Sequence, residues 1–153
     1  MDNFSSIIDE IYAAPVDPQK WSIVLDELAR VGGAKGAALL VERSDEWIGW
    51  RVSESLEPAA SHHFSKNRIG IGIAPSRLKA MNRAGFVADH EEFSDSEYRA
   101  LPFVRDFAIP NNLYHSAGTV IDTPHGDWML FCLYREAGAA PFGSDELEKL
   151  DYF

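Results

Sequence analysis

The segment Asp89-His90-Glu91-Glu92 holds the densest group of side chains that could bind a metal ion or move a proton. Imidazole and carboxylate groups bind zinc and act as general acids and bases. Successive residues of an extended segment point to opposite sides, however, so these four side chains cannot all converge on one ion. We therefore expect an exposed acidic loop here and no metal site.

Sequence motifs of catalytic sites do not occur in the chain. There is no G-x-S-x-G, no Gly-rich loop ending in G-K-S/T, no cysteine pair and no H-E-x-x-H. Ile69-Gly70-Ile71-Gly72-Ile73 lacks the third glycine and the acidic residue of a dinucleotide-binding fingerprint, and we interpret it as a loop. The sequence predicts neither an enzyme nor a bound cofactor. A small enzyme that uses Asp89, His90 or His115 is the least favoured hypothesis.

The remaining histidines and the single cysteine have simple structural interpretations. His62 and His63 stand near the end of a short predicted helix and are expected to face solvent. His125 belongs to a turn whose geometry is set by the neighbouring proline and glycine. Cys132 is the only cysteine, so an internal disulfide is impossible, and its apolar neighbours predict a small core residue.

Length and charge limit the class of protein. The chain has 153 residues, of which 46% are hydrophobic, and this suits one compact domain spanning residues 1–153. A net charge of -10 repels phosphate, so this segment should not bind nucleic acid directly. The longest apolar run, residues 37–41, is too short to cross a membrane, and residues 1–3 do not begin a secretory signal. We expect a cytoplasmic protein.

One local concentration of basic residues precedes an acidic stretch, and we expect the two to neutralise each other on solvated faces. The basic residues are Lys66, Arg68, Arg77, Lys79 and Arg83, and the acidic ones are Asp89, Glu91, Glu92, Asp95 and Glu97.

Aromatic side chains, at 12% of the residues, are more informative than the polar ones. Ligand pockets are mostly apolar with a few placed polar groups, and many of these aromatics fall on segments expected to line a central layer. Core packing is the alternative role for each aromatic residue, and a surface ion pair is the alternative for Arg105. The candidate ligand-binding residues are Trp50, Phe64, Phe86, Phe103, Arg105, Phe107, Tyr114 and His115.

The first third of the chain predicts two helices followed by a hairpin. Apolar residues recur at helical spacing in residues 3–12, where Asn3 can cap the helix. Asp17-Pro18 predicts the start of a second helix, which Gly32-Gly33 ends. Residues 36–42 and 47–53 are then expected to form paired strands.

The middle segment predicts short elements. Helices are expected at residues 58–64 and 75–84, with a short strand at 86–88. Ser94 and Glu97 form a capping box that predicts a helix through Leu101. Pro102 then begins a segment with an apolar face made of Phe103, Val104 and Phe107.

The last two strands, residues 114–122 and 128–135, indicate how the domain is layered. Both faces of the second strand are apolar, so helices must cover both sides of the sheet. This predicts an α+β fold with an antiparallel sheet of about five strands, terminal helices packed together on one face and the middle segment on the other. One face carries Leu130, Cys132 and Tyr134, and the other carries Met129, Phe131 and Leu133.

The final helix begins near Ser144, and its apolar residues Leu147, Leu150 and Phe153 continue to the last residue. We expect that helix to continue in a longer protein, so that this module passes its output to another part.

Several local sequences resemble the N-terminal PAS- or GAF-like sensory domain of LuxR-type helix-turn-helix regulators. They are Ile11-Tyr12-Ala13-Ala14 with Asp17-Pro18-x-x-Trp21, Gly36-Ala37-Ala38-Leu39, Phe103-Val104-Arg105-Asp106-Phe107, and Leu133-Tyr134-Arg135 before Pro141-Phe142. The resemblance covers nearly the whole chain and implies a DNA-binding module after the terminal helix. Members that bind acyl-homoserine lactones carry Trp-x-x-x-Tyr followed by Asp-Pro, and the middle segment lacks this pattern.

The main functional hypothesis is a signal-sensing domain that binds an unknown small molecule and forms a homodimer through its N- and C-terminal helices. The alternative is a ligand-free dimerisation scaffold of the same architecture.

Overall fold

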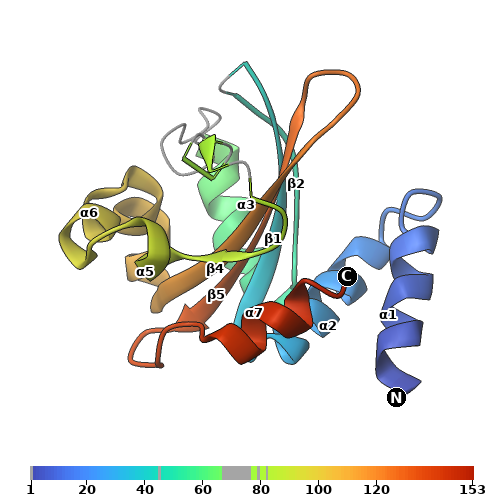
Figure 1. Cartoon of the computed structure of the whole chain (residues 1–153). Coiled ribbons are helices and arrows are strands. Elements are labelled where there is room, and N and C mark those ends of the chain that lie inside the picture. The colour runs from blue at the N-terminus through green and yellow to red at the C-terminus, as the bar shows by residue number, and fades with distance from the viewer. Residues whose placement is uncertain (1, 45, 67–76, 79, 82) are drawn as a thin grey trace.

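A five-stranded antiparallel sheet of order β2-β1-β5-β4-β3 forms the centre of the molecule (Figure 1). The computed structural model describes residues 2–44, 46–66, 77–78, 80–81 and 83–153. The strands are β1 (Gly36–Arg43), β2 (Glu46–Val52), β3 (Val87–Ala88), β4 (Leu113–Asp122) and β5 (Trp128–Glu136).

The β4–β5 hairpin forms because its turn has the residues that a tight reversal needs. Gly126 adopts a φ of 83°, which favours glycine, and its N–H donates to the Thr123 carbonyl at 3.0 Å. The carboxylate of Asp127 accepts two hydrogen bonds from Arg43 at 2.7 Å, which joins the turn to the end of β1. The predicted strands agree with the structure to within one residue at each end.

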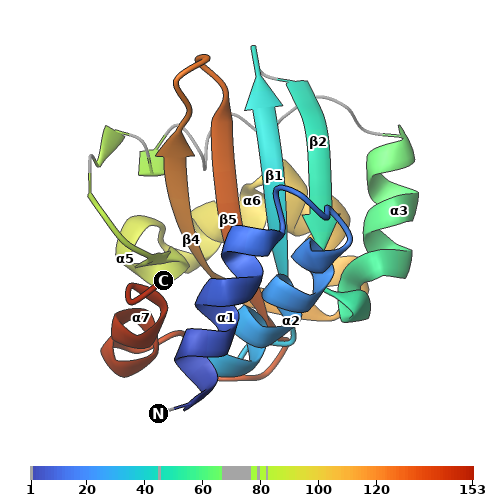
Figure 2. The ribbon, with the colours of Figure 1, turned by 90° about the vertical axis from the view of Figure 1, so that its right-hand side faces the viewer.

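Three helices cover one face of the sheet, as Figure 2 shows. They are α1 (Asp2–Ala13), α2 (Lys20–Val31) and α7 (Ser144–Leu150). Their buried side chains, together with those of that sheet face, make a terminal-helix cluster. It includes Ile7, Val24, Leu25, Leu28, Leu39, Phe86, Leu133, Phe142, Leu147 and Leu150.

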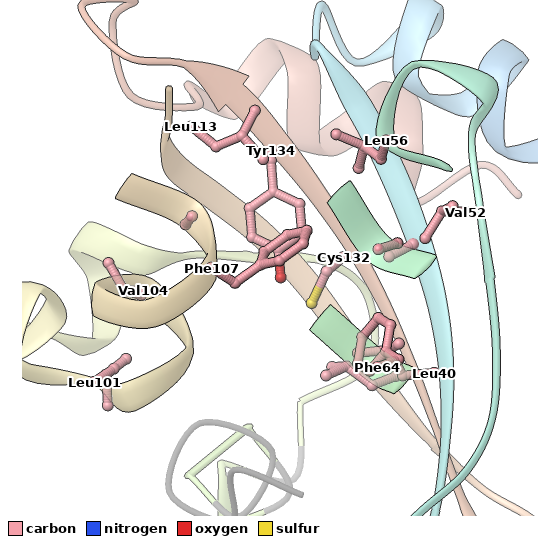
Figure 3. Packing of buried hydrophobic residues seen from close by; sticks show 14 of the residues in the cluster. Leu40, Val52, Leu56, Phe64, Leu101, Val104, Phe107, Leu113, Cys132 and Tyr134 are labelled. Atoms are coloured by element: carbon pink, nitrogen blue, oxygen red, sulfur yellow. The ribbon is translucent and has the colours of Figure 1, made fainter. Parts of the chain in front are cut away.

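Short elements of the middle segment cover the other face. They are η1 (Glu54–Leu56), α3 (Glu57–Lys66), α5 (Asp89–Glu92), α6 (Asp95–Ala100), the π-helical segment η2 (Val104–Ala108) and η3 (Ile109–Asn111). Their buried side chains, together with those of that sheet face, form a middle-segment cluster (Figure 3). It includes Leu40, Val52, Leu56, Phe64, Tyr98, Leu101, Val104, Phe107, Leu113, Leu130, Cys132 and Tyr134.

The alternation predicted for the last strand is confirmed. Leu130, Cys132 and Tyr134 belong to the middle-segment cluster, whereas Leu133 belongs to the terminal-helix cluster with Met129 and Phe131 packed against it. The predicted α+β fold with a PAS/GAF-like antiparallel sheet is also confirmed.

The predicted helix starts at Asn3 and Asp17-Pro18 were wrong. The first helix already includes Asp2, so Asn3 lies inside it. Before α2 the chain makes tight turns in which Lys20 N–H donates to the Asp17 carbonyl and Trp21 N–H to the Pro18 carbonyl. Because these bonds span three residues, the α-helix itself begins only at Lys20.

Two later helices end earlier than predicted. The predicted capping box of Ser94 and Glu97 is present, but α6 ends at Ala100, one residue before the predicted end at Leu101. The last helix ends at Leu150, three residues earlier than expected, where the Asp151 carboxylate accepts a hydrogen bond from the Phe86 N–H at 2.6 Å.

Two predictions for the middle segment fall wholly or partly on residues that the structure does not describe. The loop interpretation of residues 69–73 lies outside the described residues. Of the predicted helix at 75–84, residues 75, 76, 79 and 82 also lie outside the described residues. Residues 77, 78 and 80 are helical, whereas 81, 83 and 84 are not. None of the described helices has the length and apolar character needed to cross a membrane.

Candidate ligand-binding site

A cavity of about 70 Å³ lies between the sheet and the middle segment. Strands β1, β3, β4 and β5 form its floor, and residues 93–104 with Leu78 form much of its roof. Its wall is lined by Leu40, Leu78, Val87, Ala88, Asp89, Glu92, Phe93, Tyr98, Leu101, Phe103, Val104, Ser116, Gly118, Leu130, Cys132 and Tyr134. The space exceeds the roughly 10–15 Å³ that one water needs and is smaller than the roughly 150 Å³ of a cavity that binds benzene.

Gly118 lies in the floor of the cavity, where the lack of a side chain leaves space open. A Cβ atom at this position would lie 3.3 Å from the Cys132 Sγ and 3.4 Å from a methyl group of Leu78. Any larger residue would therefore push against both the floor and the roof.

Tyr98 fastens the roof to the floor. Its buried hydroxyl donates to the Ser116 Oγ at 2.9 Å, which joins α6 to β4. Burial raises the pKa of Tyr98, so the ring stays neutral and can donate this bond. The other roof elements, α5 and η2, are short, and η2 contributes Val104 to the wall. π-Helical turns of this kind are frequent at functional sites.

The expectation that residues 89–92 form an exposed acidic loop was wrong for Asp89. The residue follows β3 directly and starts the four-residue helix α5, so it is carried to the edge of the sheet, beside the cavity. Its side chain is only 5% exposed. The Nδ1 of His115 lies 3.1 Å from one carboxylate oxygen, Oδ2.

The other oxygen, Oδ1 of Asp89, is buried and has no hydrogen-bond partner among the described residues. The His90 Nδ1 lies 3.9 Å from this oxygen, beyond hydrogen-bond distance. A buried acceptor left without a partner costs about 1–3 kcal/mol, and more if it carries a charge. Such a group in a cavity wall offers binding energy to any ligand that donates a hydrogen bond to it.

The described part of the wall is acidic at one end and apolar elsewhere. Asp89 and Glu92 line it, while no described lysine, arginine or histidine does. Arg77 contacts Glu92 from outside the wall, with Nε 4.0 Å from its carboxylate, and its guanidinium covers the Phe93 ring at 4.6 Å. The site therefore favours positive over negative ligands.

The thiol of Cys132, in the floor of the cavity, is unreactive. Cys132 is buried, and burial raises the pKa of its thiol to about 12. Since the thiolate is the reactive form, this side chain acts as a small apolar residue, as the sequence predicted.

Four of the eight candidate residues come together in one aromatic cluster beside the cavity. Trp50 stacks on Phe64 with ring centroids 5.3 Å apart, and Phe103 stacks on Phe107 at 4.7 Å. Phe64 lies 6.5 Å from Phe103 and 6.4 Å from Phe107. Of these four, Phe103 lines the cavity.

The other four candidates lie apart from the aromatic cluster. Phe86 is in the terminal-helix cluster, on the opposite face of the sheet. Tyr114 packs edge-on against Tyr98 and donates to Asp95, while His115 contacts Asp89.

Arg105 is exposed and binds its neighbour Asp106, with donor–acceptor distances of 2.6 and 2.8 Å. This is the surface ion pair that the sequence left open as the alternative.

His63 differs from the solvent-facing position expected for it. Its ring contacts those of Phe64, Phe103 and Phe107, with centroid distances of 5.2, 5.5 and 5.1 Å. Helix α3 turns this residue toward the aromatic cluster, because the buried Ala60 and Phe64 lie three residues before it and one after it. Desolvation lowers the pKa of His63, an effect larger than the opposing attraction of Asp106.

Most cavity residues were not selected from the sequence. Leu130, Cys132 and Tyr134 could have been found, since their alternation was read correctly and only their exposure to a cavity was unknown. Asp89 carried no usable signal, because an acidic residue in a polar stretch is usually exposed.

Opposite charges in the middle segment pair as predicted where they are described. Arg77 lies 3.7 Å from the Glu97 carboxylate, and Arg83 lies 3.4 Å from that of Glu91. Within the described ranges, no three His, Cys, Asp or Glu side chains lie close enough together to hold a metal ion.

Comparisons with known proteins give a match at the level of structure. No family model matches the chain, and neither does any curated protein. Among solved structures, the VqsR LBD domain from Pseudomonas aeruginosa has a TM-score of 0.62 and 14% identity, over 97% of this chain and 87% of that one.

Two further structures share the fold. SdiA from Escherichia coli has a TM-score of 0.59 and 15% identity, and the match covers 99% of this chain and 65% of SdiA. The N-acylhomoserine lactone dependent LuxR family transcription factor CepR2 from Burkholderia cenocepacia has a TM-score of 0.55 and 12% identity, over 99% and 88% of the two chains. At these identities the likeness establishes the fold. This chain has the fold of LuxR-family ligand-binding domains.

Proposed function

We propose that this chain is the small-molecule-sensing and dimerisation domain of a cytoplasmic LuxR-type transcriptional regulator. The observation that carries the proposal is the largely apolar cavity between sheet and middle segment, in a chain that shares the LuxR-family fold over nearly its whole length. Ligand sites are typically apolar and hold a few placed polar groups.

The size of the cavity suggests how a signal could arise. At about 70 Å³ it is well below the ~300–1,000 Å³ of pockets that enclose drug-sized ligands. A larger ligand must therefore move the roof away from the sheet. A ligand that binds the opened state more tightly than the closed state shifts the population toward the opened state.

A physical route leads from the cavity to the terminal helix. Val87, Ala88 and Asp89 line the cavity, and the preceding residue, Phe86, donates its backbone N–H to Asp151 at 2.6 Å, directly after α7. Movement of β3 would pull on this bond. The output would then pass through α7 to a DNA-binding module, since the net charge of -10 makes this segment a poor DNA ligand.

Exposed apolar residues support dimerisation through the terminal helices. Tyr12 in α1 is 80% exposed, Val16 in the following turn is 90% exposed, and Ile23 in α2 is 52% exposed. These three exposed side chains come from one stretch of the chain, residues 12–23, and exposed apolar patches are typical of interaction sites.

A ligand screen tests the sensing part of the proposal. We expect compounds that bind the native state to raise the melting temperature and to shift the methyl resonances of Leu40 and Leu130, which line the cavity. Leu25 in the terminal-helix cluster serves as the unshifted control. If a broad metabolite set raises no melting temperature, the chain is a ligand-free scaffold.

Sedimentation velocity tests dimerisation. We expect a concentration-dependent dimer that Val16→Ser weakens, and the control Ile121→Ser, at a 47% exposed position on β4, should leave it intact. A monomer mass at every concentration would remove the dimer from the proposal. Reading the coding sequence beyond Phe153 for a helix-turn-helix module tests the regulatory part.

A further inference from the structure

We propose that the cavity binds a small organic amine, whose protonated nitrogen binds the buried carboxylate of Asp89 and whose short carbon body fills the apolar floor. This assignment rests on the proposed sensing function and names the chemical class of its ligand.

The Asp89 carboxylate favours a ligand that donates a hydrogen bond. Its Oδ1 is buried without a hydrogen-bond partner among the described residues, and its side chain is 5% exposed, although Asp89 lies in the cavity wall. His115 contacts the other oxygen, Oδ2, at 3.1 Å. Because His115 already contacts Oδ2, Oδ1 is the oxygen left for a ligand N–H, and the ligand meets it when the wall around it opens.

Charge in the wall favours a cation over a neutral donor. Asp89 and Glu92 are the charged residues that line the described wall, and both are acidic. Arg77, the cation outside the wall, donates to the Glu92 carbonyl at 3.4 Å and lies 3.7 Å from the Glu97 carboxylate. A protonated amine adds the missing positive charge, whereas a carboxylate or phosphate group would be repelled.

The volume limits the carbon body. A cavity of about 150 Å³ accommodates the six carbons of benzene. The 70 Å³ found here thus leaves room for about three carbons between Leu40, Leu130 and Val104. The probe that matches this size is n-propylammonium, with 1-propanol and propionate as its neutral and anionic isosteres.

Titrations followed by methyl NMR test the assignment at constant ionic strength. At a ceiling of about 1.5 kcal/mol per heavy atom, a four-atom probe binds with a Kd of about 40 μM at best, so the titrations extend well into the millimolar range. We expect n-propylammonium to shift the Leu40 and Leu130 methyl resonances saturably. It should bind about 10-fold or more tightly than 1-propanol, and propionate should not bind.

Asp89→Asn keeps the shape of the side chain and removes its charge. In this variant the amine and the alcohol should bind equally, while Asp145→Asn, at an exposed position in α7, should keep the amine preference. If the Asp89 variant does not fold, the relative affinities of the unmodified chain for the amine, the alcohol and the carboxylate test the amine assignment.

Three results would overturn the amine assignment. They are equal affinity of the unmodified chain for amine and alcohol, an amine preference that survives in Asp89→Asn, and the lack of any saturable shift with the amine. If 1-propanol or propionate shifts the cavity methyl groups and the amine does not, the amine class is wrong and the sensing function stands. The sensing function itself fails only with the wider metabolite screen.

Discussion

Two leucines on the same strand provide a direct test of where the cavity lies. Leu130 faces the cavity and is 7% exposed, whereas Leu133 faces the terminal helices and is 1% exposed. Leu133 is tightly packed, since a Cβ on Gly32 would lie only 2.8 Å from one of its methyl groups. Replacing each by alanine is the same chemical change on opposite faces of β5.

The expected losses of stability differ because one site already borders empty space. Leu→Ala substitutions in cores cost about 2.7–5.0 kcal/mol, and the cost rises by about 24 cal/mol per Å³ of cavity created. Leu133→Ala loses contacts on all sides, and the flanking strands hold the backbone in place, so we expect about 4–5 kcal/mol. Leu130 already lacks contacts toward the cavity, so we expect about 3 kcal/mol for Leu130→Ala. Urea unfolding followed by circular dichroism measures both values.

Benzene distinguishes the two variants independently of stability. The space that Leu130→Ala opens adds to the existing 70 Å³, whereas the space that Leu133→Ala opens stands alone. Only the first variant therefore approaches the ~150 Å³ that admits benzene. Benzene at ten times its Kd should therefore stabilise Leu130→Ala by about 1.4 kcal/mol and leave Leu133→Ala unchanged.

The reasoning is refuted if Leu130→Ala costs as much as Leu133→Ala, or if benzene does not stabilise Leu130→Ala. Either result would mean that the sheet face below the middle segment is solidly packed.

Two further perturbations probe the surroundings of the cavity. Because burial lowers the pKa of His63, the unfolded chain binds more protons, so stability should fall as the pH drops below about 6.5 and through the folded-state value. His63→Phe should show a smaller fall between neutral and mildly acidic pH by urea unfolding, and an unchanged pH dependence would contradict the burial of this ring. Asp151→Ala removes the acceptor for the Phe86 N–H and should cost about 1–2 kcal/mol, with faster amide exchange at Phe86 and Val87. Exchange that stays as slow as in the unmodified chain would mean that β3 is held independently of α7.

The layered fold followed from local sequence patterns. Alternation in β5 was apolar on both faces, and this alone required helices on both sides of the sheet. The capping box at Ser94 and the glycines after α2 placed helix ends because they act within a few residues. The start of α2 was missed because Pro18 fits both a helix start and the tight turn that the structure contains.

The candidate site followed from the sequence only in part. Four of the aromatic residues selected from the sequence lie in one cluster, and their role in ligand binding stays a prediction. They are Trp50, Phe64, Phe103 and Phe107. Which aromatic residues share a face depends on how segments distant in sequence pack, so Phe86 was grouped with side chains from which the sheet separates it.

Periodicity and turn chemistry are properties of neighbouring residues, so the primary structure was sufficient to define the strands, the helices and the two-sided covering of the sheet. Burial of a particular polar atom depends on chain segments brought together from far apart. Asp89 became part of a cavity wall because β3 pairs with β4 and leads directly into α5, which begins at this residue. An acidic residue among other acidic residues contains no local sign of that position, so it emerged only from the packing of the folded chain.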